Sequence, residues 1–199
     1  MNRQVFVIHG GNAYDSHKEY MIALQNKQVS LEDLRTTDWK MTLQQKLGSA
    51  FEVYCPAMPN KQNAKYAEWK IWFEKFVPFM EPNVILIGHS LGAIFLAKYL
   101  SENIFPVTIR ATLLVGAPFN TPTNHPLADF NLGAVLSLLS KQAGDVFLYH
   151  SKDDQIVPYS NFQDYQQALP NTHLFSFEDR GHFRDEKFPE IIESIHTFA

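Results

Sequence analysis

The sequence predicts an α/β protein, a three-layer sandwich whose central sheet holds roughly six, mostly parallel strands. Short apolar runs rich in β-branched residues alternate with helix-like stretches, which is the order that builds parallel sheets. Several of these runs are apolar throughout, as strands covered on both faces are. With 199 residues, the chain is long enough for one well-buried core and short for two. We therefore expect a single domain over residues 1–199.

The predicted strands are short apolar runs spaced along the whole chain. They lie at about 4–9, 52–57, 84–88, 111–117, 146–150 and 173–178. Cys55 falls inside the second of them, where we expect it to serve as a small apolar residue. As the single cysteine of the chain, it has no partner for an internal disulfide.

Helical periodicity predicts five helices between and after these strands. They lie at about 37–47, 66–79, 91–104, 160–169 and 188–198. The helix at 91–104 is apolar nearly all round, so we expect it to be central and buried. The helix at 66–79 carries Trp69, Trp72, Phe73 and Phe76 at helical spacing, a pattern more typical of core packing than of a cofactor site.

Two segments interrupt the alternation of strands and helices. Residues 12–36 form a charged, partly helical excursion after the first strand, and residues 118–140 hold three prolines followed by an apolar stretch. Long connections in compact domains are often lids or binding loops, so both segments are candidate lids. Together with residues 12–36, Phe119 and Phe130 suggest that the substrate pocket is apolar.

The composition excludes several classes of partner. The formal net charge of −4 provides neither a basic surface for nucleic acid nor a polybasic patch for membranes. No apolar run approaches the roughly 20 residues of a membrane-spanning helix. The apolar run near the start, in MNRQVFVIHGG, is too short for a signal peptide. We expect a cytoplasmic protein; the oligomeric state stays open.

A serine between two glycines marks the centre of the predicted chemistry. In the stretch GHSLG, Ser90 lies between Gly88 and Gly92, where an apolar strand turns into a helix. This is the context of a nucleophilic serine on a tight turn, because side chains at the two flanking positions would collide with the neighbouring strand and helix. The alternative is that Ser90 only caps the helix.

A nucleophilic serine needs a histidine as general base, and in this arrangement the histidine follows the serine in the chain. The histidines after Ser90 are His125, His150, His173, His182 and His196. His182 comes just after a predicted strand and a glycine, at the sheet edge where Ser90 must lie, and is the preferred base. His173 and His196 fall inside a strand and a helix and read as packing or surface residues. His125 and His150 stay as alternatives.

The base needs an acid that orients it, and this acid is expected between the serine and the histidine. Asp153 and Asp154 come just past the strand at 146–150, at the same edge of the sheet. Aspartate also favours turns and helix starts, so a purely structural pair is the alternative. Asp129, Asp179 and Asp185 are weaker candidates.

The developing oxyanion requires two backbone N–H donors. One is expected from Leu91, the residue after the serine, at the N-terminus of a helix. The other is expected from the loop HGGN after the first strand, where we favour Gly11 and then Asn12. Gly10 and Gly11 are also compatible with a plain turn.

The sequence predicts neither a metal nor a cofactor. No two histidines have the spacing of metal ligands on a helix, and HSKDD matches no coordination pattern well. The HGGN loop lacks the third glycine of a dinucleotide-binding turn. The chemistry is therefore expected to depend on side chains and backbone alone.

The sequence resembles an α/β-hydrolase with a minimal cap. The resemblance depends on five segments in this order: the first strand, the HGG loop, GHSLG, DDQIVP and GHF. The short chain, and the GHF that leads into a C-terminal helix, are similar to the small serine-hydrolase family that includes retinoblastoma-binding protein 9. The resemblance covers residues 4–11 and 52–198. It implies Ser90 as nucleophile, His182 as base and Asp154, four residues before a proline, as acid. Residues 12–36 are longer than this family leads us to expect.

From these features we expect a serine hydrolase that cleaves a small-molecule carboxylic ester, or a thioester, through an acyl-enzyme. Two alternatives stay open. One is a binding protein that keeps the fold for a peptide or protein partner, and the other is a different reaction on the same scaffold, such as a lyase or perhydrolase. Function belongs to the site and not to the fold, so the geometry of the site must decide.

Overall fold

The computed structural model describes residues 3–31, 37–120, 125–133 and 136–199. Its centre is one six-stranded sheet in which every strand pair is parallel, with the spatial order β2-β1-β3-β4-β5-β6. The strands are β1 (Arg3–Ile8), β2 (Phe51–Tyr54), β3 (Val84–His89), β4 (Ile109–Val115), β5 (Asp145–Ser151) and β6 (Thr172–Phe177). The predicted α/β sandwich and all six predicted strands are confirmed, with ends shifted by a few residues.

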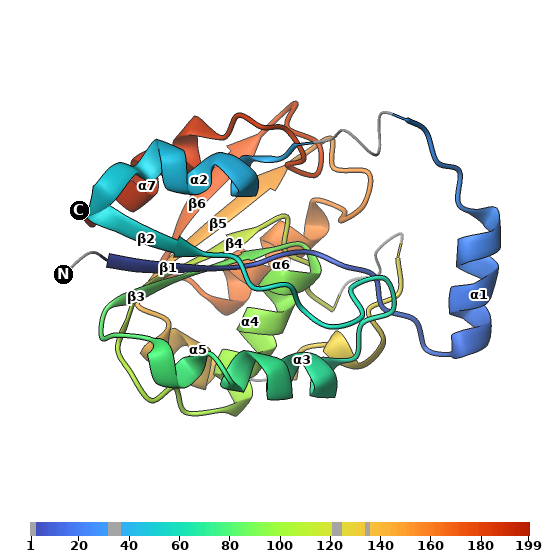
Figure 1. Cartoon of the computed structure of the whole chain (residues 1–199), viewed down its shortest axis with the longest axis horizontal. Coiled ribbons are helices and arrows are strands. Elements are labelled where there is room, and N and C mark those ends of the chain that lie inside the picture. The colour runs from blue at the N-terminus through green and yellow to red at the C-terminus, as the bar shows by residue number, and fades with distance from the viewer. Residues whose placement is uncertain (1–2, 32–36, 121–124, 134–135) are drawn as a thin grey trace.

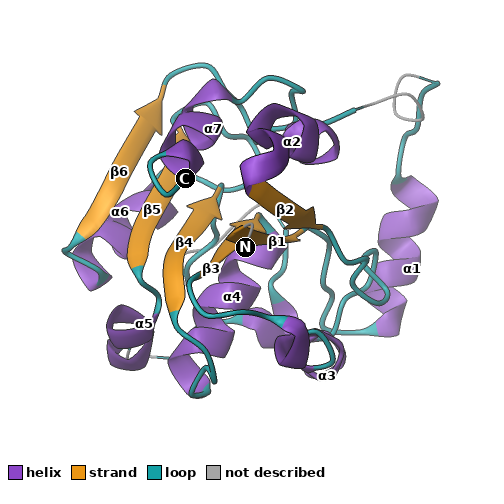
Figure 2. Ribbon diagram, turned by 60° about the vertical axis from the view of Figure 1, so that its left-hand side comes forward, coloured by secondary structure: helices purple, strands orange, loops and turns teal. Residues whose placement is uncertain are grey.

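Helices cover both faces of the sheet and form the outer layers of the sandwich (Figure 1). They are α1 (His17–Asn26), α2 (Trp39–Leu47), α3 (Tyr66–Glu74), α4 (Leu91–Glu102), α5 (Ser137–Gln142), α6 (Ser160–Ala168) and α7 (Pro189–His196). Residues of α2 and α7 pack on one face of the sheet, and residues of α3, α4, α5 and α6 pack on the other. Figure 2 shows α1 standing apart from both layers.

Strand β3 shows why the central strands are apolar throughout. All six of its residues are buried. Ile85 and Ile87 point into the core under α2 and α7, whereas Val84 and Leu86 point into the core under α4. Both faces of the strand are therefore removed from water, which is the origin of the continuous apolar run. The adjoining α4 is buried along most of its length, as its sequence predicts.

The order of the strands places two loops side by side. From β1 the chain moves outward to β2 and then returns past β1 to β3, so the direction of winding reverses between β1 and β3. Crevices for ligands form at such switch points, at the carboxyl ends of the strands. Because Ile8 pairs with Gly88 in the register, the residues after β1 lie beside the residues after β3.

Some local predictions are wrong in detail. Trp69 and Phe73 of α3 are fully buried, but Trp72 is 42% exposed and its indole N–H donates to the carbonyl of Ala57 at 3.0 Å. The helix ends at Glu74, and a short 3-10 turn follows it. Cys55 lies just past the end of β2 and is exposed, so it does not pack as an apolar strand residue.

The two interrupting segments are described in part. Within residues 12–36, α1 begins after Ser16, whose hydroxyl accepts a hydrogen bond from the N–H of Glu19, and it buries none of its residues. Within residues 118–140, α5 begins at Ser137. Residues 32–36, 121–124 and 134–135 lie outside the described residues. Over the described ranges, no helix is long and apolar enough to cross a membrane.

Candidate active site

Ser90 occupies a strained turn between a strand and a helix. Strand β3 ends at His89 and α4 begins at Leu91, so Ser90 alone makes the turn. Its backbone has φ 56° and ψ −122°, in a region that costs a non-glycine residue about 1–3 kcal/mol. The side chain makes no capping bond to α4. The capping alternative is therefore wrong, and the strain presents the hydroxyl at the carboxyl edge of the sheet.

The glycines on either side of Ser90 are required by close backbone contacts. A Cβ atom added to Gly88 would lie 2.5 Å from the Cα of Ala93 in the first turn of α4. A Cβ atom added to Gly92 would lie 2.2 Å from the carbonyl oxygen of Ile8 in β1. Both distances are far below van der Waals contact, which confirms the steric reason given for the GHSLG pattern.

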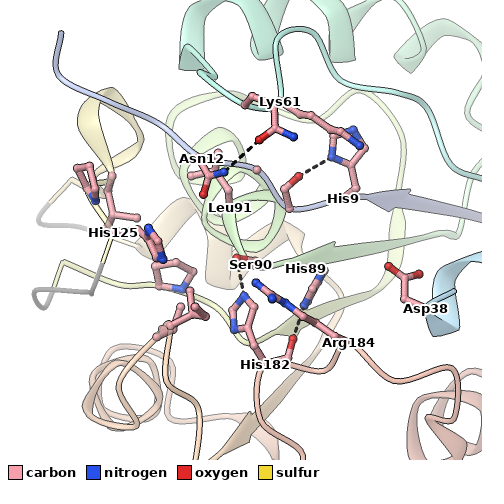
Figure 3. A pocket seen from close by; sticks show the side chains of 18 of the residues that line it. His9, Asn12, Asp38, Lys61, His89, Ser90, Leu91, His125, His182 and Arg184 are labelled. Carbon is pink, nitrogen blue, oxygen red and sulfur yellow. Dashed lines mark hydrogen bonds between the residues drawn. The ribbon is translucent and has the colours of Figure 1, made fainter. Parts of the chain in front are cut away.

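A chain of hydrogen bonds joins Ser90, His182 and Asp154. The Nε2 atom of His182 lies 2.8 Å from the Oγ of Ser90 (Figure 3), and its Nδ1 atom lies 2.7 Å from the Oδ2 of Asp154. The three residues follow β3, β6 and β5, so three strand ends bring them together. A neutral imidazole that donates from Nδ1 to the carboxylate accepts the serine hydroxyl proton at Nε2.

The carboxylate of Asp154 is held in the ionised form. Burial opposes its ionisation, but hydrogen bonds from His182 and from the N–H groups of Val157 and Ile156 outweigh burial and lower the pKa of Asp154. The two N–H groups donate to Oδ1 at 2.9 and 2.8 Å, which leaves Oδ2 for the imidazole. The side chain is fully shielded from water. It therefore presents a negative charge to His182 in a fixed direction.

Asp153 has a different task from its neighbour. It is exposed, and its Oδ1 accepts hydrogen bonds from the hydroxyl of Ser151 at 2.5 Å and from the N–H of Gly181 at 2.8 Å. These bonds tie the end of β5 to the loop that carries His182. Asp129, another candidate acid, accepts a bond from the N–H of Tyr66 at 3.0 Å, away from His182.

The other candidate histidines have different surroundings. His150 is buried and donates from Nε2 to the carbonyl of Val157 at 2.8 Å, and burial lowers its pKa. His173 stacks on Phe147 on the exposed strand β6. His196 is exposed on α7, with its ring against the edge of a phenylalanine. His125 lines the pocket described below.

The loop after β1 lies against the serine, as the register requires. A Cβ atom on Gly10 would be 3.0 Å from the Cβ of Ser90, and Gly11 lines the same pocket as Ser90 and Leu91. The N–H of Leu91 lies in the first turn of α4, where helices leave N–H groups without an intrahelical acceptor. The N–H of Asn12 donates to the carbonyl of Lys61 at 2.8 Å, so our second choice of donor is wrong.

His9 shapes this loop, a role that the sequence analysis missed. Its Nε2 accepts a hydrogen bond from the N–H of Met58 at 2.8 Å, so the ring proton is on Nδ1, which donates to the carbonyl of Gly10 at 2.6 Å. Burial is the main cause that lowers the pKa of His9 and keeps this tautomer neutral. The sequence feature that could have indicated this role is the position of His9 directly before Gly10 and Gly11.

A second buried histidine holds the backbone of His182. The Nε2–H of His89 donates to the carbonyl of His182 at 2.9 Å, and its Nδ1 accepts a bond from the ammonium of Lys40 at 3.3 Å. Lys40 in turn forms an ion pair with Asp38 at 2.6 Å. Burial and then the charge of Lys40 lower the pKa of His89 well below its ordinary value. His89 therefore stays neutral and keeps its acceptor for Lys40.

Helix α2 adds further bonds to the segment that follows His182. The indole N–H of Trp39 donates to the carbonyl of Phe183 at 3.1 Å, and its backbone N–H donates to the carbonyl of Asp185 at 3.0 Å. Phe183 has a φ of 52°, a left-handed conformation that needs such support. Sequence patterns gave no signal for this contact, because the bonded residues lie 144 positions apart.

A pocket of about 660 Å³ opens over Ser90 (Figure 3). Apolar lining comes from Leu91, Pro126, Leu127 and Ile156, and positively charged lining comes from Lys27, Lys40, Lys61 and Arg184. Phe130 is fully buried beneath α3, and Phe119 packs on Tyr165. Neither phenylalanine lines the pocket, so the expectation of an apolar pocket built on them is wrong. Across the described residues, no group of histidine, cysteine and acidic side chains is arranged to hold a metal ion.

The all-parallel sheet between two helical layers, with a strained serine on the turn between β3 and α4, defines an α/β-hydrolase. Residues 30–194 match the model of the serine hydrolase family, and the chain belongs to that family. The resemblance seen in the sequence is thereby confirmed.

Individual relatives agree with this assignment. The chain is 25% identical over 195 residues to YdeN of Bacillus subtilis (strain 168), covering 96% of this chain and 92% of YdeN. It is also 25% identical over 156 residues to the serine hydrolase RBBP9 of Rattus norvegicus, covering 74% and 77% of the two chains. The crystal structure of the B. subtilis ydeN gene product superposes with a TM-score of 0.79 at 21% identity, over 99% of this chain and 98% of that one.

Proposed function

We propose that the protein cleaves carboxylic esters, or thioesters, through an acyl-enzyme formed on Ser90. The observation that carries this proposal is the unbroken hydrogen-bond chain from Asp154 through His182 to Ser90. Membership of the serine hydrolase family supports the reaction class. A binding protein on this fold would gain nothing from the strained backbone of Ser90, so we prefer hydrolysis to that alternative.

The first half of the proposed reaction forms the acyl-enzyme. As the Oγ of Ser90 attacks the ester carbonyl, the Nε2 of His182 takes the hydroxyl proton, and the carboxylate of Asp154 stabilises the imidazolium that forms. The tetrahedral oxyanion accepts hydrogen bonds from the N–H groups of Leu91 and Gly11. Each such donor lowers the barrier by about 3–4 kcal/mol in enzymes where it has been removed. His182 then gives its proton to the departing alcohol or thiol.

The second half of the reaction repeats these steps with water. His182 takes a proton from a water molecule, the hydroxide attacks the acyl carbonyl, and the same N–H groups hold the second oxyanion. Collapse of this intermediate returns the proton to the Oγ of Ser90 and releases the carboxylic acid. The step needs no metal and no cofactor.

The test is covalent labelling combined with turnover. A fluorophosphonate should label the protein at Ser90, and 4-nitrophenyl esters of increasing acyl length should show a burst of nitrophenolate. Ser90→Ala should abolish the label and lower kcat by about 10⁴ or more, because the serine, histidine and acid act as one unit. Ser137→Ala, an exposed serine on α5, is the matched control and should change neither readout. Labelling at a serine other than Ser90, or full turnover by Ser90→Ala, would contradict the proposal.

A further inference from the structure

The pocket carries positive charges that the proposed chemistry does not use. Lys27, Lys61 and Arg184 line the same cavity as Ser90, and all three side chains are exposed to it or to solvent. Figure 3 shows Arg184 extending toward Ser90 and His182, with Lys61 on the opposite wall near His9. The cations thus come from separate parts of the chain: the end of α1, the loop before α3, and the loop that carries His182.

Among the residues that the structure describes, no acid forms an ion pair with these three cations. Within the described part of the chain, no carboxylate lies within 4.0 Å of the charged groups of Lys27, Lys61 or Arg184. The one acid among the described lining residues, Asp38, already forms an ion pair with Lys40 at 2.6 Å. Counted over the described lining residues alone, positive charges outnumber negative ones by three, although the chain as a whole has a net charge of −4. An excess of positive charge in the pocket of a chain whose net charge is negative indicates that the pocket prefers an anionic ligand.

The field of Arg184 reaches both sides of Ser90. After burial, the charges of His182 and Arg184 contribute to lowering the pKa of His125, on the loop after β4. Arg184 also adds to the effect of burial, Lys40 and His182 on the pKa of His89. Clefts lined by one sign of charge concentrate counter-ions and raise association rates. A substrate with a negative charge would be attracted to the serine before it makes any contact.

We propose that the substrate is an ester or thioester that carries a carboxylate near the scissile carbonyl, bound by Arg184, with Lys61 and Lys27 adding to the positive field of the pocket. The planar guanidinium of Arg184 matches a carboxylate with two parallel hydrogen bonds. The apolar side chains of Leu127 and Ile156 remain for the hydrocarbon part of the same molecule. This inference rests on the proposed function, because it assigns the substrate class of that same site.

The experiment compares matched esters that differ in one charge. 4-Nitrophenyl hydrogen adipate is paired with 4-nitrophenyl hexanoate, and 4-acetoxybenzoate is paired with its methyl ester, so the charge lies on the acyl side or on the leaving group. In at least one pair, kcat/KM for the anion should exceed that of the neutral ester by about tenfold or more at low ionic strength. The preference should shrink toward unity in 1 M NaCl, where the Debye length is about 3 Å.

Charge removal then tests the assigned residues. Arg184→Gln and Lys61→Gln should each reduce the ratio of anionic to neutral kcat/KM by about threefold or more, mainly through KM, and the double variant should reduce it further. Lys141→Gln, an exposed lysine on α5, removes the same charge away from the pocket and should leave the ratio unchanged. An anion preference that survives the double variant would overturn the assignment to these cations.

The outcomes separate this inference from the proposed function. If both neutral esters are hydrolysed as fast as their anionic partners in a reaction that depends on Ser90, the carboxylate inference is wrong and the serine hydrolase stands. If no ester of either kind is hydrolysed and the fluorophosphonate leaves Ser90 unlabelled, the proposed function and this inference both fall.

Discussion

Two adjacent aspartates differ entirely in their surroundings. The carboxylate of Asp154 is buried and faces His182, whereas that of Asp153 is exposed and bonds to Ser151 and Gly181. The two residues follow β5 in a turn, in which the N–H of Asp154 donates to the carbonyl of Ser151, and their side chains have different partners. The difference gives a direct test of which carboxylate supports the reaction.

Asp154→Asn should lower kcat by about 10⁴, as in comparable triads. The amide oxygen still accepts the N–H groups of Ile156 and Val157, but the NH₂ group faces Nδ1 of His182 and forces the proton onto Nε2. That tautomer cannot accept the serine proton. Asp153→Asn keeps the acceptor for Ser151 and Gly181 and should lower kcat by less than about tenfold. Steady-state kinetics of both variants on one ester checks this; a greater loss in Asp153→Asn would reverse the assignment.

Helix α2 is the element that fixes the loop of His182 from outside. It begins at Trp39, after an N-cap from Asp38, and Trp39 donates to the carbonyls of Phe183 and Asp185 through its indole and backbone N–H groups. Lys40 continues the same support through His89 to the carbonyl of His182. These bonds position the imidazole relative to Ser90, so we expect Trp39 and His89 to affect the rate through His182.

His89→Ala should lower kcat by about tenfold or more with KM changed by less than about twofold, because misplacing a reacting group by 1 Å can cost about 10²-fold. Trp39→Phe should have a smaller effect on kcat and lower the stability by about 1–3 kcal/mol, since it leaves a buried carbonyl without its donor. Lys46→Gln is the control: it removes an exposed bond to the carbonyl of Glu186 and should leave kcat unchanged.

The measurement is the rate of fluorophosphonate labelling at saturating reagent together with kcat and KM. Labelling should slow in step with kcat, because both reactions need the serine and the imidazole in register. Normal labelling and normal kcat in His89→Ala and Trp39→Phe, with a lower melting temperature alone, would show that α2 supports only the fold.

Two buried histidines, His89 and His150, lie where the active-site edge of the sheet meets the apolar core. His89 and His150 are almost completely buried, and burial is the main cause that lowers the pKa of each. Both lie at the carboxyl ends of central strands, β3 and β5, where polar side chains meet the apolar layers. In the unfolded chain these histidines titrate near their ordinary pKa of about 6.5.

The free energy of unfolding should therefore decrease as the pH falls below about 6.5. Below this pH the unfolded chain binds protons at His89 and His150, whereas the folded chain does not. Each histidine therefore lowers the free energy of unfolding by up to about 1.4 kcal/mol per pH unit, until the pH reaches its pKa in the folded chain. Stability from this source is complete above pH 7. Urea unfolding at pH 7.5, 6.5 and 5.5 measures the slope, and His150→Gln should make it shallower. An unchanged slope would show that the pKa of His150 is the same in the folded and the unfolded chain.

The sequence by itself determined the sandwich, the order of the strands and helices, and the residues of the serine turn. These features depend on neighbours in the chain: apolar runs mark strands covered on both faces, and the glycines of GHSLG mark a turn whose clashes arise from local geometry. The chain order of Ser90, Asp154 and His182 was also enough to propose that they meet at one sheet edge.

Only the tertiary structure decided what surrounds these residues. The support of His182 by α2 joins positions up to 144 residues apart, and the N–H of Asn12 donates to the carbonyl of Lys61. The pocket has both apolar and cationic lining, and neither Phe119 nor Phe130 is part of it. No periodicity encodes such contacts, because the strand order and the packing of helices on the sheet set which distant side chains meet. A local sequence pattern determines the secondary structure around a residue, whereas the side chains that it contacts depend on the whole fold.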